Sequence, residues 1–187
     1  ERSRRQRQMC IRDRAGTAAA GATNLVADGS VGYRQADLSW DMDAVTVVDG
    51  VILEVWSSNQ TQLNASSAEV HSTFLVGSTE GLAQPEPGAW YDDCFRTVNG
   101  VEAPVHRLDN GTAVLPVGTT SVACTLTGLA AGSDVYLAVW SVGPDGATNL
   151  SASVLATTTV ADVLAAPLDT SPYLSPSAPS RSASSRC

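Results

Sequence analysis

The stretch DVYLAVWSVGPDGATNLSASVLATT, residues 134–158, decides the fold class of this chain. Its two ends are rich in β-branched and other apolar residues, a composition that favours strands. Between them lies GPDGATN, residues 143–149, whose glycine, proline, aspartate and asparagine are typical turn residues. The stretch therefore predicts two strands joined by a hairpin-type connection.

The same period of two recurs nearer the N-terminus. ADLSWDM, residues 36–42, places Ala36, Leu38 and Trp40 on one face and polar residues on the other, which is the pattern of a half-buried strand. GVILEVWSS, residues 50–58, follows an Asp-Gly turn dipeptide and alternates again. Its two faces would carry Val51, Leu53 and Val55 on one side and Ile52, Glu54 and Trp56 on the other.

Two further segments, STFLVGS (72–78) and SVACTLTGL (121–129), also read as short strands. No segment shows apolar residues at helical spacing between capping residues. We therefore expect an all-β fold of six or seven short strands, arranged as a two-sheet antiparallel sandwich.

Four segments carry a resemblance to fibronectin type III domains, which are immunoglobulin-like sandwiches. They are NLVADG (24–29), LSW (38–40), DGVILEVWS (49–57) and the run from TLTGL to LATT (125–158). The resemblance implies a non-catalytic module that binds ligands or spaces neighbouring modules of the same chain. The family usually has a tyrosine six residues after the leucine of TLTGL, whereas this chain has Val135 there and Tyr136 on the opposite face.

The expected domain spans residues 23–163, with an insertion at about 57–121, because the segment before SVACTLTGL is longer than the family needs. Residues 15–22 read as a linker, and residues 164–187, rich in Ser and Pro, read as a disordered tail or linker. Residues 4–14, RRQRQMCIRDR, resemble the translation of a transposase adaptor used in sequencing libraries. We expect residues 1–14 to be an assembly artefact and the chain to be a fragment that lacks its natural signal peptide.

The net charge of the chain limits the kinds of partner that it can bind. The chain has a net charge of −8, and residues 15–166 carry sixteen Asp and Glu against only Arg34, Arg96 and Arg107. An acidic body repels phosphate backbones, so nucleic acid is not an expected partner. No apolar run reaches the length of a membrane span.

Cysteines and asparagines indicate the compartment. Cys94 and Cys124 are the cysteines within the acidic body, and they form either a disulfide or two buried free thiols. Four of the six asparagines begin an N-x-[ST] triplet, the acceptor of N-linked glycans: Asn59, Asn64, Asn110 and Asn149. These triplets favour an extracellular or cell-surface glycoprotein.

Aromatic residues give the candidate contact surface: Trp56, Trp90, Tyr91 and Trp140. In PEPGAWYDDCFR (85–96), Trp90, Tyr91 and Phe95 next to Asp92 and Asp93 would offer ring faces to sugars and carboxylates to a cation. The alternative is that Trp90 and Phe95 close one end of the sandwich. Trp56 and Trp140 either face a ligand or pack beneath the insertion.

Catalytic and metal-binding patterns are weak. His71 and His106 form no HExxH motif or zinc-type spacing, and Asp41, Asp43 and Asp49 lack EF-hand spacing, so we predict neither a metal site nor a cofactor. The chain contains no lysine and no G-x-S-x-G motif. We predict that it is not an enzyme.

The expected function is a non-catalytic extracellular binding or spacer module of a larger adhesion or receptor-like protein, with a protein or carbohydrate ligand. An accessory module of a secreted enzyme, such as a carbohydrate-active one, is the alternative. An intracellular scaffold domain, with reduced cysteines and unused acceptor triplets, is the third possibility.

Overall fold

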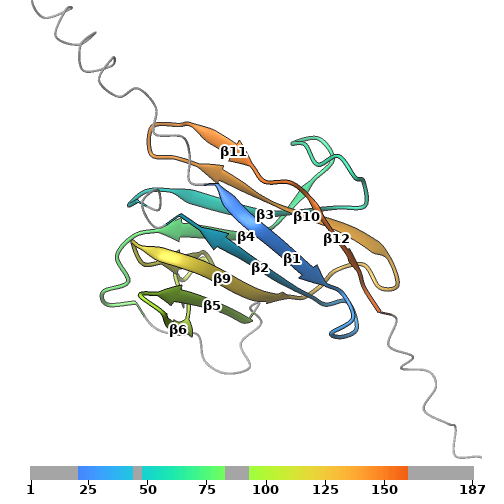
Figure 1. Ribbon diagram of the computed structural model, residues 1–187, viewed down its shortest axis with the longest axis horizontal. Helices are drawn as coiled ribbons and strands as arrows, with labels where there is room; N and C mark the ends of the chain where they lie inside the picture. Colours follow the sequence, from blue (N-terminus) through green and yellow to red (C-terminus); the bar gives the residue numbers. More distant parts are fainter. Residues whose placement is uncertain (1–20, 44–47, 83–92, 160–187) are drawn as a thin grey trace, which may run out of the picture.

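A computed structural model of the chain describes residues 21–43, 48–82 and 93–159, and all of its regular structure there is β. Twelve strands form two sheets that pack face to face (Figure 1). The strands are β1 (Ala22–Asp28), β2 (Ala36–Met42), β3 (Ile52–Ser58), β4 (Glu69–Val76), β5 (Asp93–Val98), β6 (Val101–Pro104), β7 (His106–Arg107), β8 (Ala113–Leu115), β9 (Thr119–Leu126), β10 (Asp134–Val142), β11 (Thr148–Leu150) and β12 (Val154–Thr157). The expectation of an all-β sandwich is confirmed.

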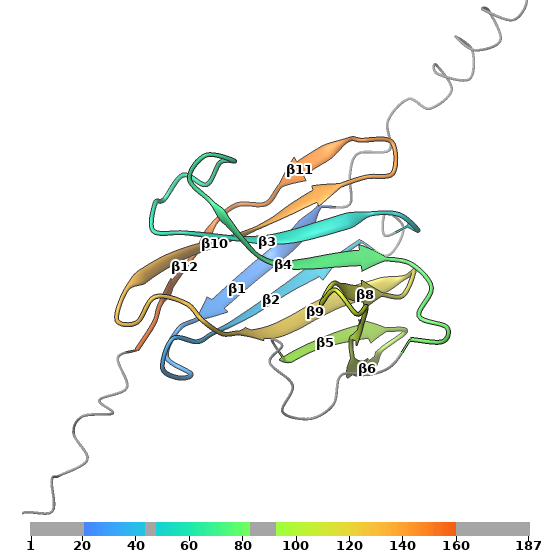
Figure 2. The same ribbon diagram turned by 180° about the vertical axis from the view of Figure 1, so that it is seen from behind.

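The two sheets have different strand orders. The five-stranded sheet runs β1-β2-β9-β5-β6, and the seven-stranded sheet runs β11-β10-β3-β4-β8-β7, with β12 also pairing with β10 (Figure 2). The order β1-β2-β9-β5 is the A-B-E-D order of immunoglobulin-like sandwiches, and β10, β3 and β4 correspond to strands F, C and C′.

Residues 57–121, expected as an insertion, are part of both sheets. They contain β4 to β8, of which β5 and β6 extend the five-stranded sheet while β4, β8 and β7 extend the other. Of these, β4 covers most of the expected strand STFLVGS, whereas β5 to β8, together with β11 outside this segment, raise the number from the expected six or seven to twelve. Most strand pairs are antiparallel, but β4 pairs with β8 in parallel, and Tyr33 and Thr159 form an isolated parallel bridge.

The core lies between the sheets and follows the predicted alternation. Ala36, Leu38 and Trp40 of β2 face inward, as do Val51, Leu53 and Val55 around β3. The ring of Trp40 meets the ring of Phe74, on β4 of the opposite sheet, edge to face at 5.6 Å between centroids. This contact joins the two sheets at the centre of the molecule.

Turn residues fix the hairpins on both sheets. In GPDGATN, Gly143 N donates to Ala147 O at 2.7 Å and Gly146 has a φ of 83°, so the expected turn is present, but β11 already begins at Thr148 within this stretch. Asn99 and Gly100, with φ of 50° and 76°, form the two-residue turn between β5 and β6. Positive φ at both central positions is typical of a type I′ turn.

A disulfide joins two neighbouring strands of the five-stranded sheet. Cys94 on β5 lies directly opposite Cys124 on β9, with their Cα atoms 4.1 Å apart, and both side chains are buried. The bond closes a loop of 30 residues, which contains β6, β7 and β8. It therefore holds β5 against β9, and the open choice between disulfide and free thiols is resolved for the disulfide.

Gly29 follows β1 and lies very close to the backbone at the end of β12. A Cβ atom at this position would lie 2.2 Å from the carbonyl oxygen of Thr157. We expect Gly29→Ala to lower the free energy of unfolding by about 1–3 kcal/mol in a denaturant titration, because backbone must move to admit the methyl group. In the matched control Gly21→Ala, the new methyl meets only the side chain of Asn149 and should cost much less; equal losses would contradict the close approach.

The disulfide should account for a large share of the stability. In a Cys10→Ser, Cys187→Ser background, we expect replacement of both Cys94 and Cys124 by Ser to lower the free energy of unfolding by about 3–4 kcal/mol, from loop-closure entropy in the unfolded chain. Chemical denaturation monitored by tryptophan fluorescence measures the difference. A loss below about 1 kcal/mol would mean that the strand pairing alone holds β5 on β9.

Candidate functional site

His71 lies at an irregular point of β4. Val55 pairs with Ser72 and Trp56 pairs with Val70, so His71 is the extra residue of a bulge, a feature that redirects a side chain. Its Nδ1 lies 2.9 Å from Ser72 Oγ, and its Nε2 lies 2.6 Å from the carbonyl oxygen of Thr127. The imidazole thus links β4 of one sheet to the segment that follows β9 of the other.

The segment Thr127–Leu129 is held from a second side by Arg34. Arg34 Nε donates to Leu129 O at 2.8 Å, and Leu129 N donates to Arg34 O at 3.0 Å. A guanidinium and an imidazole thus contact the carbonyl groups of Leu129 and Thr127, the two ends of the TGL turn (Thr127–Leu129). The two side chains clamp the connection between β9 and β10.

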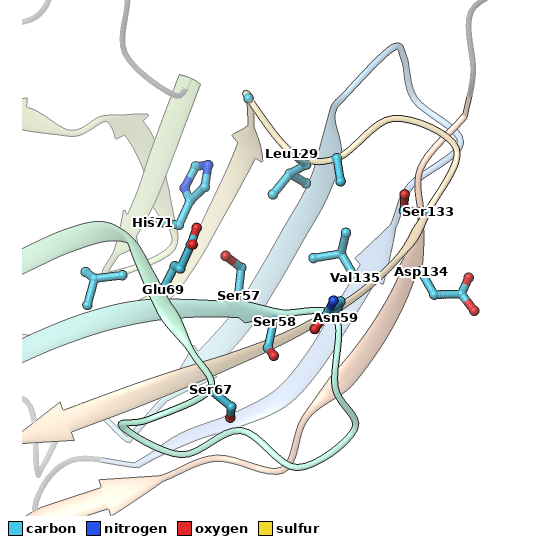
Figure 3. A pocket seen from close by; sticks show the side chains of 13 residues that line it. Ser57, Ser58, Asn59, Ser67, Glu69, His71, Leu129, Ser133, Asp134 and Val135 are labelled. Carbon is cyan, nitrogen blue, oxygen red and sulfur yellow. The ribbon is translucent and has the colours of Figure 1, made fainter.

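A cleft of about 440 Å³ opens beside this clamp (Figure 3). It lies between the β3–β4 connection and the β9–β10 connection. Its lining includes Ser57, Ser58, Asn59, Glu69, His71 and Leu129. In Figure 3, His71 and Leu129 lie on the same side of the cleft, whereas the Asp134 carboxylate points away from it. Both ring nitrogens of His71 contact protein groups, so the ring acts as a clasp between the two connections.

The candidate contact residues Trp56 and Trp140 stack on each other. Their rings are 5.0 Å apart and 17° from parallel, on the outer face of the seven-stranded sheet. Trp56 Nε1 donates to Glu54 Oε2 at 2.9 Å, and Leu63 from the β3–β4 connection packs onto the cluster. Trp56 is only 7% exposed, so this pair serves mainly as a second small core. This agrees with the alternative that the two tryptophans are packed beneath another segment, and that segment is the β3–β4 connection. Tyr136 belongs to the same cluster, on the face opposite the main core.

Several predicted residues lie elsewhere or outside the described residues. Trp90, Tyr91 and Asp92 fall within 83–92, of which nothing is described. His106 Nδ1 lies 3.1 Å from Leu82 O, far along the chain from the cleft at His71. Within residues 21–43, 48–82 and 93–159, no three His, Cys, Asp or Glu side chains are grouped so that they could hold a metal ion.

The four glycan-acceptor asparagines are all exposed and all belong to one half of the sandwich. Asn59 and Asn64 lie in the β3–β4 connection, Asn110 lies between β7 and β8, and Asn149 lies on β11. Asn64 Oδ1 accepts hydrogen bonds from the backbone of Ser66 and Ser67 at 2.9 and 3.1 Å. Every one of these positions is on the seven-stranded sheet or its connections.

The outer face of the five-stranded sheet contains none of these asparagines. It carries rows of carboxylates instead, and we call it the acidic face. Strand register places Asp28, Asp37, Thr125 and Asp93 in one row across β1, β2, β9 and β5. The next row contains Val26, Ser39, Ala123, Phe95 and Pro104. A third row contains Asp41, Ser121, Thr97 and Glu102. An apolar row therefore lies between two rows that carry carboxylates.

Large apolar side chains remain open on the acidic face. Val26 is 62% exposed and Phe95 is 41% exposed. They line a shallow hollow of about 300 Å³ that also includes Asp28, Asp37 and Asp93. The predicted residues Phe95 and Asp93 lie here, on the open face of the sheet. The sequence signal for the face is the alternation within each strand, but its assembly into rows needs the pairing of strands far apart in the chain.

Hydroxyl groups orient two of the carboxylates. Thr125 Oγ1 donates to Asp37 Oδ1 at 2.6 Å, and Ser30 donates to Asp28 Oδ1 from both its hydroxyl and its backbone N–H, at 2.6 and 2.8 Å. The Ser30 hydroxyl, and then its N–H, lower the pKa of Asp28 below its ordinary value. Asp28 therefore stays charged to lower pH than a free aspartate.

Ser30→Ala should raise the pKa of Asp28 towards its ordinary value, because the largest cause of the lowering is removed. A depressed native pKa means that the stabilising contribution is present above the unfolded pKa and is lost as pH falls through the native pKa. Carboxyl-carbon NMR titration measures the change, with the distant exposed-loop variant Ser66→Ala as control. An Asp28 titration curve that is the same in Ser30→Ala and in the unmodified chain would contradict the assignment of the cause.

Comparisons with other proteins were made at three levels. No protein-family model, no curated protein and no solved structure matches the chain. What the cleft and the acidic face can do therefore follows from their own residues and geometry.

Proposed function

We propose that this chain is a non-catalytic extracellular binding or spacer module of the fibronectin type III kind, within a larger adhesion or receptor-like protein. One observation carries the proposal. The four glycan-acceptor asparagines are all exposed and all lie on the half of the sandwich that includes the seven-stranded sheet, which leaves the acidic face free of acceptors. Glycans at these positions would be bulky and would leave the acidic face open for contacts with a partner.

The disulfide supports an extracellular location. Cys94 and Cys124 are bonded within the core, and structural disulfides persist in oxidising compartments. No helix among the described residues is long and apolar enough to cross a membrane.

The strand order supports the family proposal. The A-B-E-D arrangement of β1, β2, β9 and β5, with β10, β3 and β4 in the other sheet, agrees with immunoglobulin-like sandwiches. Trp40 lies on β2, and TLTGL leads from β9 into the connection to β10, which supports the proposal.

Among the described residues, the aromatic side chains favour a protein ligand over a carbohydrate. A sugar-binding platform requires an open ring face, whereas Trp56 is covered by its stack on Trp140 and by Leu63. Phe95 has an exposed aromatic ring that faces outward beside carboxylates. A phenyl ring between acidic rows fits a protein surface.

Secretion of the chain from eukaryotic cells behind an added signal peptide tests the proposal. We expect N-linked glycans at Asn59, Asn64, Asn110 and Asn149, and a Cys94–Cys124 linkage in the unreduced protein, both read by peptide mass spectrometry. Asn24 and Asn99 lack the acceptor triplet and serve as internal controls. Secreted protein without glycans at any of the four positions, or with both cysteines as free thiols, would contradict an extracellular module.

A further inference from the structure

We infer that the acidic face is a docking surface for a Lys- and Arg-rich protein segment that also carries apolar side chains. The inference rests on the proposed function, since it names the contact side of the extracellular module and the chemistry of its partner.

The charge on this face has a single sign. Its outward positions include five carboxylates, from Asp28, Asp37, Asp41, Asp93 and Glu102, and no basic residue among the described residues. Of the three described arginines, Arg34 is bonded to the TGL turn, Arg96 lies on the opposite face of β5 with its Nε buried, and Arg107 lies on β7 of the other sheet. The field above the sheet therefore attracts cations and repels anions.

Two carboxylates of like charge face each other across neighbouring strands. Asp28 and Asp37 are direct cross-strand partners, and like charges in that position are destabilising. Oriented by Ser30 and Thr125, these carboxylates stay exposed to solvent. A basic group placed above them would offset this repulsion, which an uncharged partner cannot do.

The apolar row provides apolar surface that a partner can bury, in addition to the charge interactions. Val26 and Phe95 flank Ser39 and Ala123 across four strands, about 14 Å at the usual strand spacing. The acidic rows lie about 7 Å to either side, one side-chain repeat along the strands. A segment with apolar side chains over the central row would therefore bring its Lys or Arg side chains to both acidic rows.

Charge complementarity selects this occupant over others. A second copy of the chain would bring five carboxylates against five, and a nucleic acid or an anionic membrane would bring phosphates. A single metal ion is not favoured, because no three acidic side chains of the described residues converge. A basic protein segment satisfies both the carboxylates and the apolar row.

Titration of the intact chain with a short synthetic peptide of alternating Lys-Lys and Leu-Leu pairs tests the inference, because an extended segment of this kind carries both residue types on each face. We expect binding that weakens with salt, amide NMR shifts centred on β2, β9 and β5, and no binding of the matching Glu–Leu peptide. Asp37→Asn with Asp93→Asn should weaken binding about three- to tenfold, as expected for two exposed ion pairs. Phe95→Ala should weaken it without changing the salt dependence.

The matched control removes the same charge elsewhere. Glu80→Gln with Asp145→Asn, both exposed and outside the acidic face, should leave the affinity within about twofold apart from the small change in overall charge. Asp37→Asn keeps an oxygen that can accept the Thr125 hydrogen bond. Equal or higher stability of the double variant, measured by denaturation, would show that weaker binding is not caused by unfolding.

Three results would overturn the inference. The first is no binding of the basic peptide, or shifts centred outside the acidic face. The second is an oligomer of the chain that forms through this face, seen by sedimentation. The third is tighter peptide binding after Arg→Gln changes within residues 1–14, because the chain's own Arg-rich segment would then be the occupant. The secretion experiment reads the acceptor asparagines and this titration reads the acidic face, so either proposal can fail without the other.

Discussion

The edge-to-face contact of Trp40 with Phe74 is the interaction on which the rest of the structure depends. Trp40 is 1% exposed and Phe74 is fully buried, and each comes from a different sheet. Because side chains alternate along a strand, fixing Trp40 inside the core also fixes its neighbours outside. Asp37, Ser39 and Asp41 must then point to solvent. The acidic face is thus a direct consequence of the register that buries the core, and a one-residue slip of β2 would exchange the two.

How far the sequence predicts this structure depends on the length of each strand. β2, β3 and β10 have enough alternating residues to show their faces, and these faces are as expected. β6, β7 and β8 contain two to four residues each, too few for a period, so residues 57–121 read as an insertion. The turn Asn99-Gly100 was the available signal for the β5–β6 hairpin. The sequence alone does not decide whether the disulfide forms or which residues share the acidic rows, because both depend on the pairing of β5 with β9. Strands that pair across a long loop leave no signal in a local sequence pattern.

The two outer faces of the sandwich differ in whether their apolar residues are covered. Each carries apolar residues that a two-layer fold leaves on the solvent side. On the seven-stranded sheet, the Trp56–Trp140 stack is covered by Leu63 of the β3–β4 connection, and the acceptor asparagines lie on this sheet or its connections. On the five-stranded sheet, Val26 and Phe95 remain open between carboxylates. The charged rows keep such a face soluble, and they also restrict which partner can cover it.

Carboxylates and an apolar row have separate roles in such a contact. Exposed charges add little affinity, but they raise the association rate and exclude partners of the same sign. Burial of Val26 and Phe95 against a partner would supply affinity, because water leaves apolar surface. Thr125 and Ser30 hold two of the carboxylates in position before any partner arrives, so less side-chain freedom is lost on binding. The lowered pKa of Asp28 acts in the same direction, because the Ser30 bonds that orient this carboxylate also keep it ionised as pH falls.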